Sequence, residues 1–363
     1  MVERSVRKSV KKLKAYVPGK GKEEAKKLGA KEIIKLASNE NPLGPSPKAL
    51  KMIEKRLRDA SVYPDQYALE VKNALSKRLG VQNNNLIIGN GSDEIMQMAG
   101  AAFLSAGDEV IISENTFSTY EYVATLFDAQ PVFVPLKNHT YDLAAMADKV
   151  TERSKLIFLC NPNNPTGTIF SGAELEGFLS VLPKGIIVVM DEAYCEYVGS
   201  KSYPNSFKYI KEGKNVIILR TFSKICGLAG LRVGYGIAKP EIIKYLNMVK
   251  LPFNVNRMAI AGAIGAMGDN AFIKKSIKLN KEGKKYLYKE LKALGLKYVE
   301  TEANFICFET EKPADILFME LMRKGIIVRP LTSFGMPSSI RVTVGTKKQN
   351  KKFIAALKTF LKK

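Results

Sequence analysis

The feature that most constrains the fold is a series of short apolar runs between residues 86 and 238, separated by helical patterns. The runs are rich in isoleucine, valine and leucine and hardly alternate with polar residues, which is typical of strands buried on both faces of a parallel sheet. We expect seven strands, at 86–88, 109–113, 131–136, 155–161, 186–192, 216–220 and 233–238. Their alternation with helices predicts a three-layer α/β/α domain around a mainly parallel seven-stranded sheet.

The pattern changes after the last of these strands. A helical stretch is expected over 257–294, and short strands and helices follow it, with strands at 296–299, 304–309, 325–329 and 340–344 and helices at 314–324 and 347–361. This order predicts a smaller α+β domain. We therefore expect an N-terminal arm and loop over 1–45, a large domain over 46–265 and a small domain over 266–363. Two further helices are expected at the start of the large domain, at 47–58 and 67–79.

The chain is strongly basic, with a net charge of +22. The excess lies in residues 1–35 and 274–363, mostly as lysines at helical spacing, whereas residues 36–273 are close to neutral. The interleaved arginines and aromatics of a nucleic-acid groove are absent. We therefore interpret the lysines as a solvated face that attracts anionic substrates, and expect no nucleic-acid partner.

Three further observations narrow the class of protein. No apolar stretch is long enough to span a bilayer, and no apolar segment follows the basic N-terminus, so neither a membrane protein nor a secretory signal is expected. The four cysteines are scattered and His139 is the only histidine, which argues against a zinc site and favours free thiols. We expect a cytoplasmic protein without a metal.

A lysine surrounded by anion-binding side chains follows the expected strand 216–220. Thr221 and Ser223 precede Lys224, and Arg232 comes eight residues after it. A lysine amine can form an imine with a carbonyl cofactor, while the hydroxyls and the guanidinium hold an anionic group nearby. A lysine after a strand is more often simply exposed, so this motif alone leaves both interpretations open.

Two other motifs indicate how such a cofactor would be bound at the carboxyl ends of the strands, where open α/β sheets bind ligands. The glycine turn 89–94 contains Gly91, Ser92 and Asp93 and precedes a helix, so its backbone N–H groups can approach an anion. Asn164 lies in the proline-rich loop 161–167, where its amide can donate to a phenolate oxygen. Each of these loops alone is equally compatible with an ordinary turn.

An aspartate and two aromatic residues complete this set. Asp191 ends an apolar strand and needs a partner if it is buried, and a pyridinium N–H would be one. Tyr194 follows three residues later and can reach a hydroxyl on the same ring. Phe117 follows the strand 109–113 and can stack on a flat ring. A helix cap or salt bridge for Asp191 and a core position for Phe117 are the alternatives.

With these motifs in order, the chain resembles the fold-type I pyridoxal-phosphate aminotransferases. Within them it is similar to the histidinol-phosphate aminotransferase branch. The resemblance extends from residue 16 to residue 346, so it covers nearly the whole chain. It rests on the segments Tyr16-Val-Pro-Gly19, Ala37-Ser-Asn-Glu-Asn-Pro42, 161–167, 221–224, 228–235, 325–330 and 340–346.

The resemblance implies a set of cofactor-binding roles. Lys224 would bind pyridoxal 5′-phosphate covalently and move the reacting proton, and Asp191 would pair with the pyridinium nitrogen. Asn164 and Tyr194 would bind the ring oxygen, and Phe117 would stack on the ring, where some relatives have tyrosine. The phosphate would be held by the remaining residues, which are Gly91, Ser92, Asp93, Thr221, Ser223, Arg232 and, from the neighbouring subunit of a homodimer, Tyr63.

The resemblance also implies substrate-binding roles for four residues. Arg341 would bind the carboxylate or the phosphate end of the substrate, and Arg329 would be a second phosphate-binding arginine. Tyr16 would cover the substrate, and Asn41 lies in the substrate-covering loop. The implied reaction is amino transfer between L-histidinol phosphate and 2-oxoglutarate.

Two alternative functions remain open at this point, and a third is disfavoured. An aromatic amino-acid aminotransferase would use the same scaffold with phenylpyruvate as acceptor. A threonine-phosphate decarboxylase would share the scaffold and bind a phosphate. A non-catalytic regulator with an aminotransferase-like domain would need an N-terminal DNA-binding domain, and the 38 residues before Asn39 are too few for one.

Overall fold

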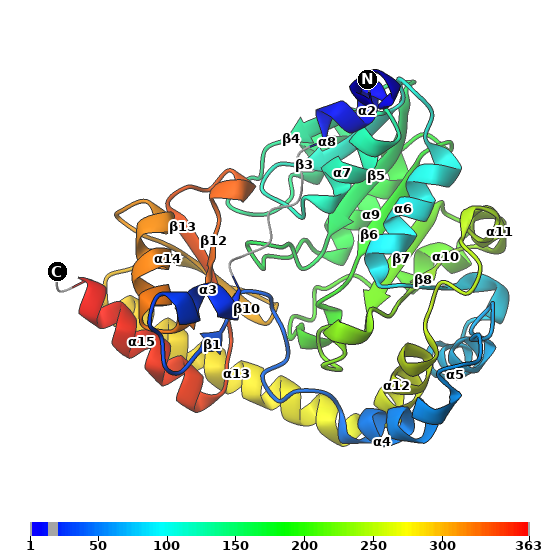
Figure 1. Cartoon of the computed structure of the whole chain (residues 1–363). Helices are drawn as coiled ribbons and strands as arrows, with labels where there is room; N and C mark the ends of the chain where they lie inside the picture. Colours follow the sequence, from blue (N-terminus) through cyan, green and yellow to red (C-terminus); the bar gives the residue numbers. More distant parts are fainter. Residues whose placement is uncertain (1, 14–20, 362–363) are drawn as a thin grey trace.

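The structure is a computed structural model of the chain and describes residues 2–13 and 21–361 (Figure 1). Its buried apolar side chains form two separate clusters. The larger cluster surrounds a seven-stranded sheet, and the smaller one lies against a four-stranded sheet. Among the described helices, none is both long enough and apolar enough to cross a bilayer.

The seven-stranded sheet matches the strands expected from the apolar runs. Its order is β2-β8-β7-β6-β5-β3-β4, and all neighbours are parallel except β8, which is antiparallel to both β2 and β7. The confirmed α/β architecture follows from strands that are buried almost throughout, apart from β4 at the edge. The strands are β2 (Leu86–Gly89), β3 (Glu109–Ser113), β4 (Gln130–Val134), β5 (Ser154–Cys160), β6 (Ile187–Asp191), β7 (Val216–Thr221) and β8 (Gly234–Ile237).

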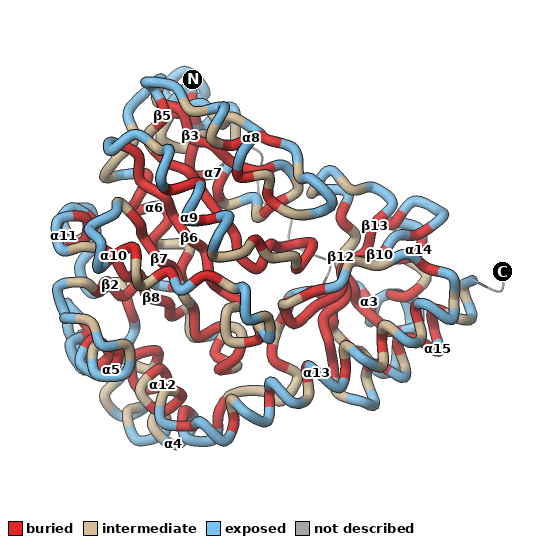
Figure 2. The backbone as a smooth tube through the Cα atoms, turned by 180° about the vertical axis from the view of Figure 1, so that it is seen from behind, coloured by how far each residue is buried: buried red, intermediate tan, exposed pale blue. Residues whose placement is uncertain are grey.

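Helices cover this sheet and extend below it (Figures 1 and 2). They are α4 (Pro47–Arg56), α5 (Leu69–Leu79), α6 (Ser92–Phe103), α7 (Thr119–Leu126), α8 (Leu143–Asp148), α9 (Gly172–Val181), α10 (Phe207–Lys211), α11 (Pro240–Val249) and α12 (Arg257–Met267). Short 3-10 turns lie at η1 (Leu57–Asp59), η2 (Asn83–Asn85), η3 (Cys195–Tyr197), η4 (Ala229–Leu231) and, in the small domain, η5 (Thr332–Phe334).

The smaller unit contains the expected strands and helices, except that the single strand expected over 325–329 is two short strands, 326–327 and 329–330, which belong to different sheets. Its antiparallel sheet has the order β12-β13-β10-β9. The strands are β9 (Tyr298–Val299), β10 (Phe305–Glu309), β11 (Ile326–Ile327), β12 (Arg329–Pro330) and β13 (Ser339–Thr343), and the helices are α13 (Asn270–Ala293), α14 (Ala314–Arg323) and α15 (Lys347–Leu361).

The helical stretch expected over 257–294 is two helices, because the chain turns at Gly268 and Asp269 between α12 and α13. Asp269 caps α13 by accepting a hydrogen bond from Phe272 N at 3.2 Å. Its other oxygen accepts one from the Ser46 hydroxyl at 2.7 Å, at the N-terminus of α4. The aspartate therefore ties the start of the long helix α13 to the large domain.

The N-terminal segment, expected as an arm and loop, contains short helices and a strand. These are α1 (Val2–Ser5), α2 (Lys8–Lys12), α3 (Lys22–Lys27) and β1 (Ile34–Lys35). Arg7 of the arm donates to Leu126 O of α7 at 3.2 Å. Strand β1 pairs in parallel with β11, and residues 25–37 contribute to the apolar cluster of the small unit. The domain limits 1–45, 46–265 and 266–363 stay a prediction, and this packing favours counting residues 25–37 with the small domain.

Candidate active site

A cavity of about 220 Å³ lies where the strand ends of the large sheet meet the loop 38–40. Its walls come from the ends of β5, β6 and β7, the N-terminus of α6, and the loop before α7. The lining residues are Ser38, Glu40, Ser92, Asp93, Phe117, Cys160, Asn164, Asp191, Ala193, Tyr194, Thr221, Ser223, Lys224, Ala229 and Arg232. Ten of the predicted site residues therefore lie around one space, although they come from distant parts of the sequence.

Lys224 lies in the turn after β7 and lines this cavity. Burial, together with the positive charge of Arg341, lowers the pKa of its amine to about 8. Its Nζ atom is 5.5 Å from the centre of the Tyr194 ring. A lysine with this pKa is neutral in about one molecule in ten at pH 7, far more often than an ordinary lysine, and a nucleophile or a base must be neutral.

Asp191 is the last residue of β6 and is almost fully buried. Tyr120 OH donates to its Oδ2 at 2.7 Å and Ala193 N to its Oδ1 at 3.1 Å. Burial raises the pKa of Asp191 to about 6, although both hydrogen bonds oppose the shift. Near neutral pH this is a buried carboxylate, which a protonated ring nitrogen would stabilise.

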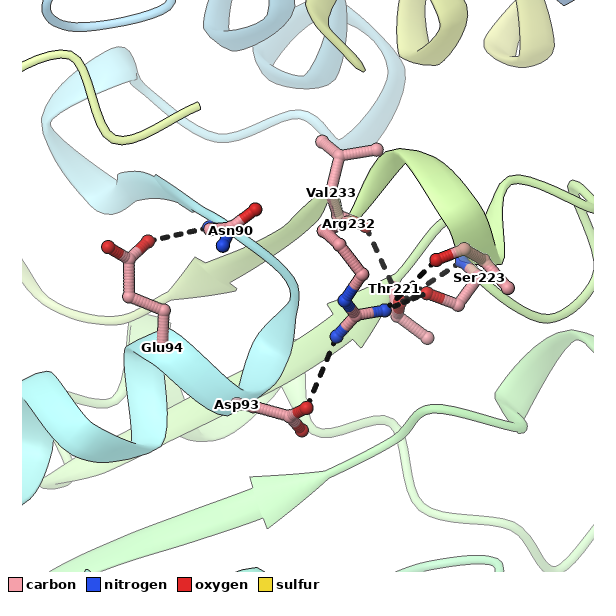
Figure 3. A network of polar contacts seen from close by, with 8 residues as sticks. Asn90, Asp93, Glu94, Thr221, Ser223, Arg232 and Val233 are labelled. Carbon is pink, nitrogen blue, oxygen red and sulfur yellow. Dashed lines mark hydrogen bonds and ion pairs between the residues drawn. The ribbon is translucent and has the colours of Figure 1, made fainter. Parts of the chain in front are cut away.

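Arg232 lines the cavity and is the centre of a polar cluster (Figure 3). Its guanidinium donates to Ser223 Oγ at 3.3 Å and to Asp93 Oδ2 at 3.2 Å. The Thr221 hydroxyl donates to Ser223 Oγ at 2.9 Å. We call Ser92, Asp93, Thr221, Ser223 and Arg232 the anion cradle, because they combine three hydroxyls, a guanidinium and the N-terminus of α6.

Two glycines bring the backbone close to this cradle. Gly91 has φ +81°, and a Cβ atom there would lie 2.4 Å from Arg232 Nη2. A Cβ atom on Gly234 of β8 would lie 2.6 Å from Ser92 N. Both positions therefore require glycine for the cradle to keep its geometry. This accounts for the Gly91 prediction, although its own atoms are not among those that line the cavity.

The three side chains that were predicted to contact the cofactor ring, Phe117, Asn164 and Tyr194, all line the cavity. Phe117 contacts Tyr120 edge-on, with ring centres 5.7 Å apart. Tyr194 is buried, and its ring meets Phe305 edge-on at 5.2 Å. Asn164 Oδ1 accepts a hydrogen bond from Arg341 Nη1, so its Nδ2 remains available as a donor.

The two predicted substrate arginines are cross-strand neighbours. Arg329 of β12 pairs directly with Arg341 of β13, so their side chains leave the same face of the sheet. Arg341 is buried and also donates to Ala37 O at 2.7 Å. Arg329 donates to Ser333 Oγ at 3.2 Å and lies over the Phe334 ring. Their substrate-binding roles stay predictions.

Three other predicted residues do not line the cavity or lie outside the residues that the structure describes. Tyr63 is 76% exposed and stacks on Phe253 at 4.7 Å, away from the cavity of its own chain. The Asn41 amide donates to Ile225 O and Ser276 Oγ, each at 2.9 Å, so its hydrogens are used within the fold. Tyr16 lies outside the described residues.

Sequence reasoning did not identify two residues that contact the site. Tyr120 binds Asp191 directly, and only its position three residues after Phe117 links it to the motif. Asn39 Nδ2 donates to Tyr194 OH at 2.9 Å. Asn39 stands within the segment 37–42 that carries part of the family resemblance, two residues before the predicted Asn41.

Comparison with known proteins agrees with this arrangement. The family model for aminotransferase class I and II matches residues 31–357. A histidinol-phosphate aminotransferase of Moorella thermoacetica is 50% identical over 98% of this chain and 92% of its own length. Histidinol-phosphate aminotransferase 2 of Carboxydothermus hydrogenoformans is 45% identical over 98% of this chain and 99% of its own.

A solved structure gives the same result for the fold. Histidinol-phosphate aminotransferase from Sinorhizobium meliloti in complex with pyridoxal-5′-phosphate superposes with a TM-score of 0.89 and 27% identity, covering 98% of this chain and 97% of that one. The sequence match, the fold and the cavity with its lysine and aspartate lead to the same conclusion. The chain belongs to the class I and II aminotransferase family.

Proposed function

We propose that this protein is a pyridoxal-phosphate-dependent aminotransferase that interconverts L-histidinol phosphate and 2-oxoglutarate with imidazole-acetol phosphate and L-glutamate, a step of histidine biosynthesis. The observation that carries the proposal is one cavity lined by a lysine, a buried aspartate and an anion cradle. The substrate follows from the near full-length relatives that bear this activity in their names.

The residues around the cavity fit the cofactor. A doubly charged phosphate suits the anion cradle, where it would neutralise Arg232 and accept from the N-terminal N–H groups of α6. A protonated ring nitrogen suits Asp191, whose burial otherwise disfavours its charge. Phe117 would stack on the ring, and Asn164 and Tyr194 would bind the ring oxygen. When bound, the protonated ring withdraws electrons and stabilises negative charge at the substrate Cα.

Lys224 is the residue that moves protons in this proposal. With the cofactor bound, the Lys224 amine would hold it covalently. Once free, the amine would move the proton between the substrate Cα and the cofactor's C4′ atom. Its lowered pKa matches this task, because a general base works best when its pKa lies near the operating pH.

Arg329 and Arg341 would select the substrate. Two guanidinium groups on one sheet face favour a substrate with a doubly charged phosphate over one with a neutral aromatic tail. The test compares imidazole-acetol phosphate with phenylpyruvate as amino acceptor, with glutamate as donor. A kcat/KM higher for the phosphate acceptor supports the proposal, and a preference for phenylpyruvate would assign the protein to the aromatic aminotransferases. Release of carbon dioxide from threonine phosphate would identify the decarboxylase alternative.

We further propose that the protein is a homodimer with shared active sites. Tyr63 and Phe253 form an exposed stacked pair, Val62 lines the same cavity as this pair and is also exposed, and Leu251, two residues before Phe253, is 71% exposed. Such a surface is typical of a region covered by a partner. In a twofold dimer the Tyr63 of each subunit would reach the anion cradle of the other.

Mixing two inactive variants tests the shared site. Neither Tyr63→Ala nor Lys224→Ala should support normal turnover alone. A hybrid dimer has one site with both substitutions and one with neither, so random reassociation of equal amounts should restore about a quarter of wild-type activity. No gain on mixing, although size measurements show that subunits exchange, would exclude sharing of Tyr63.

We also propose a cytoplasmic location. The four cysteines form no disulfide in the part of the chain that the structure describes, as expected in a reducing compartment. Fractionation of cells that make the protein, followed by immunodetection, would test this. Recovery with the membrane or secreted fraction would contradict it.

A further inference from the structure

The strongest unexplained feature near the cavity is the hydrogen bonding of Asn39, a residue with only 1% of its surface exposed. Its backbone is left-handed, with φ +56°. Its Nδ2 donates to Tyr194 OH at 2.9 Å, and its Oδ1 accepts from Thr343 Oγ1 at 3.2 Å. Because Thr343 holds the oxygen of the amide, the amide nitrogen faces Tyr194 as a donor.

This orientation fixes what Tyr194 can do. A phenol has one proton to donate, and its oxygen here accepts from Asn39. The proton of Tyr194 is therefore free for another acceptor, and Tyr194 lines the cavity where the ring oxygen of the cofactor is proposed to lie. A phenol that accepts a hydrogen bond becomes a stronger donor, because hydrogen bonds in a chain polarise one another.

The other polar groups of Asn39 are bound to the small domain. Its backbone N–H donates to Thr343 Oγ1 at 2.9 Å, and its carbonyl accepts from Asn304 Nδ2 at 3.0 Å. Thr343 lies two residues after Arg341 on β13, so both side chains leave the same face of the strand. Arg341 in turn holds Ala37 O, two residues before Asn39. The segment 37–39 is thus bound at both ends to the strand of the proposed substrate arginine.

We propose that Asn39 is a positioning residue, which directs the Tyr194 proton to the ring oxygen of the cofactor and links that oxygen to the strand carrying Arg341. The inference rests on the proposed function and deepens it. Displacement of β13 when a substrate anion binds Arg341 would change the Asn39–Tyr194 contact. Substrate binding would thereby alter the electronic state of the cofactor before any proton moves.

The holoenzyme's visible absorbance measures this effect, because its titration with pH reports the charge held on the ring oxygen. Weaker donation by Tyr194 leaves that charge less stabilised, so the titration midpoint moves to higher pH. The charged and titratable groups that face Tyr194 are Arg341, Asp191, Cys160, Tyr197 and Lys224, and an Asn39 substitution replaces none of them. A shift of the titration midpoint in an Asn39 variant therefore reports the loss of the hydrogen bond between Asn39 and Tyr194.

The decisive variant is Asn39→Gly, because glycine adopts the left-handed backbone without strain and removes only the amide. We expect the midpoint to rise by on the order of half a pH unit, less than for Tyr194→Phe, since one neutral hydrogen bond is lost indirectly. Asn39→Gly should add nothing in a Tyr194→Phe background. The matched control is Asn138→Gly, an exposed asparagine with φ +50° that should leave the midpoint unchanged.

Two substitutions at Thr343 test the link to the small domain. Thr343→Val keeps the shape but removes both hydrogen bonds to Asn39, so the midpoint should shift in the same direction. Thr343→Ser keeps the hydroxyl and should restore the wild-type value. An unchanged midpoint in Asn39→Gly, in a protein that still develops the absorbance, would overturn this inference alone. A wild-type protein that stays colourless with pyridoxal phosphate would overturn the proposed function.

Discussion

The close approach of Gly91 to Arg232 leads to a quantitative prediction for the anion cradle. Alanine at position 91 would place its Cβ atom 2.4 Å from Arg232 Nη2. Ordinary van der Waals contact begins at 3.4 Å, so the guanidinium has to retreat by about 1 Å. Its bonds to Ser223 Oγ and Asp93 Oδ2 are already 3.3 and 3.2 Å long, so at least one breaks.

The displaced arginine should weaken cofactor binding more than it weakens the fold. A hydrogen bond between charged groups is worth about 1.5–3 kcal/mol, so the Kd for pyridoxal phosphate should rise roughly 10- to 150-fold in Gly91→Ala. Left-handed backbone at an alanine costs about 1–2 kcal/mol of folding stability. Fluorescence or absorbance titration of the cofactor-free protein measures the Kd, and thermal unfolding measures the stability.

Gly107→Ala is the matched control for this prediction. Gly107 has φ +87°, similar to Gly91, but a Cβ atom there would have open space around it. Both variants should therefore lose similar stability, while only Gly91→Ala binds the cofactor more weakly. Equal Kd values for the two variants would refute the reasoning that the approach of Gly91 to Arg232 sets the geometry of the cradle.

Four further predictions concern the site. Lys224→Ala should lose the visible absorbance and nearly all turnover; turnover near the wild-type level would reject its assignment. Arg341→Ala should raise KM for imidazole-acetol phosphate roughly 10- to 150-fold while the Kd for the cofactor changes far less, and steady-state kinetics would reveal an unchanged KM. Reconstitution of the cofactor-free protein should accelerate as pH rises through about 8, because a lowered lysine pKa leaves more neutral amine above that value; a rate independent of pH would contradict this. Asp191→Asn should weaken cofactor binding at pH 7–8, where the carboxylate is ionised, and the difference from wild type should shrink below about pH 6; a difference that persists at pH 5 would count against the ion pair.

The apolar runs were sufficient to predict the large sheet. Strands such as 109–113 and 216–220 are buried on both faces, so their composition reports their environment directly. The order β2-β8-β7-β6-β5-β3-β4 and the antiparallel β8 did not follow from the runs, because short apolar segments carry no information about their neighbours. The strand in the arm was similarly hard to predict. Strand β1 has only two residues, and it is defined by its pairing with β11, which lies far away in the sequence.

Site residues were predictable where they belong to distinctive motifs. They were not predictable where a single residue contacts the site by hydrogen bonding to another site residue. Lys224, Asp191 and Arg232 stand in strings of several informative residues, and the structure brings all three to one cavity. Tyr120 and Asn39 act through one hydrogen bond each, and a tyrosine in a helix or an asparagine in a loop carries no such signal. Their partners become visible only when segments far apart in sequence are folded together.

The pairing of β1 with β11 has a consequence for biosynthesis. Ile34 lies opposite Ile326, so the segment that emerges early from the ribosome waits for roughly 290 further residues before its partner exists. At translation speeds of about 5–20 residues per second this delay lasts roughly 15–60 seconds. Throughout it, the apolar residues of this segment remain without the core that they finally join. The net charge of residues 1–35 is strongly positive, and like charges of this kind would oppose association between such nascent chains.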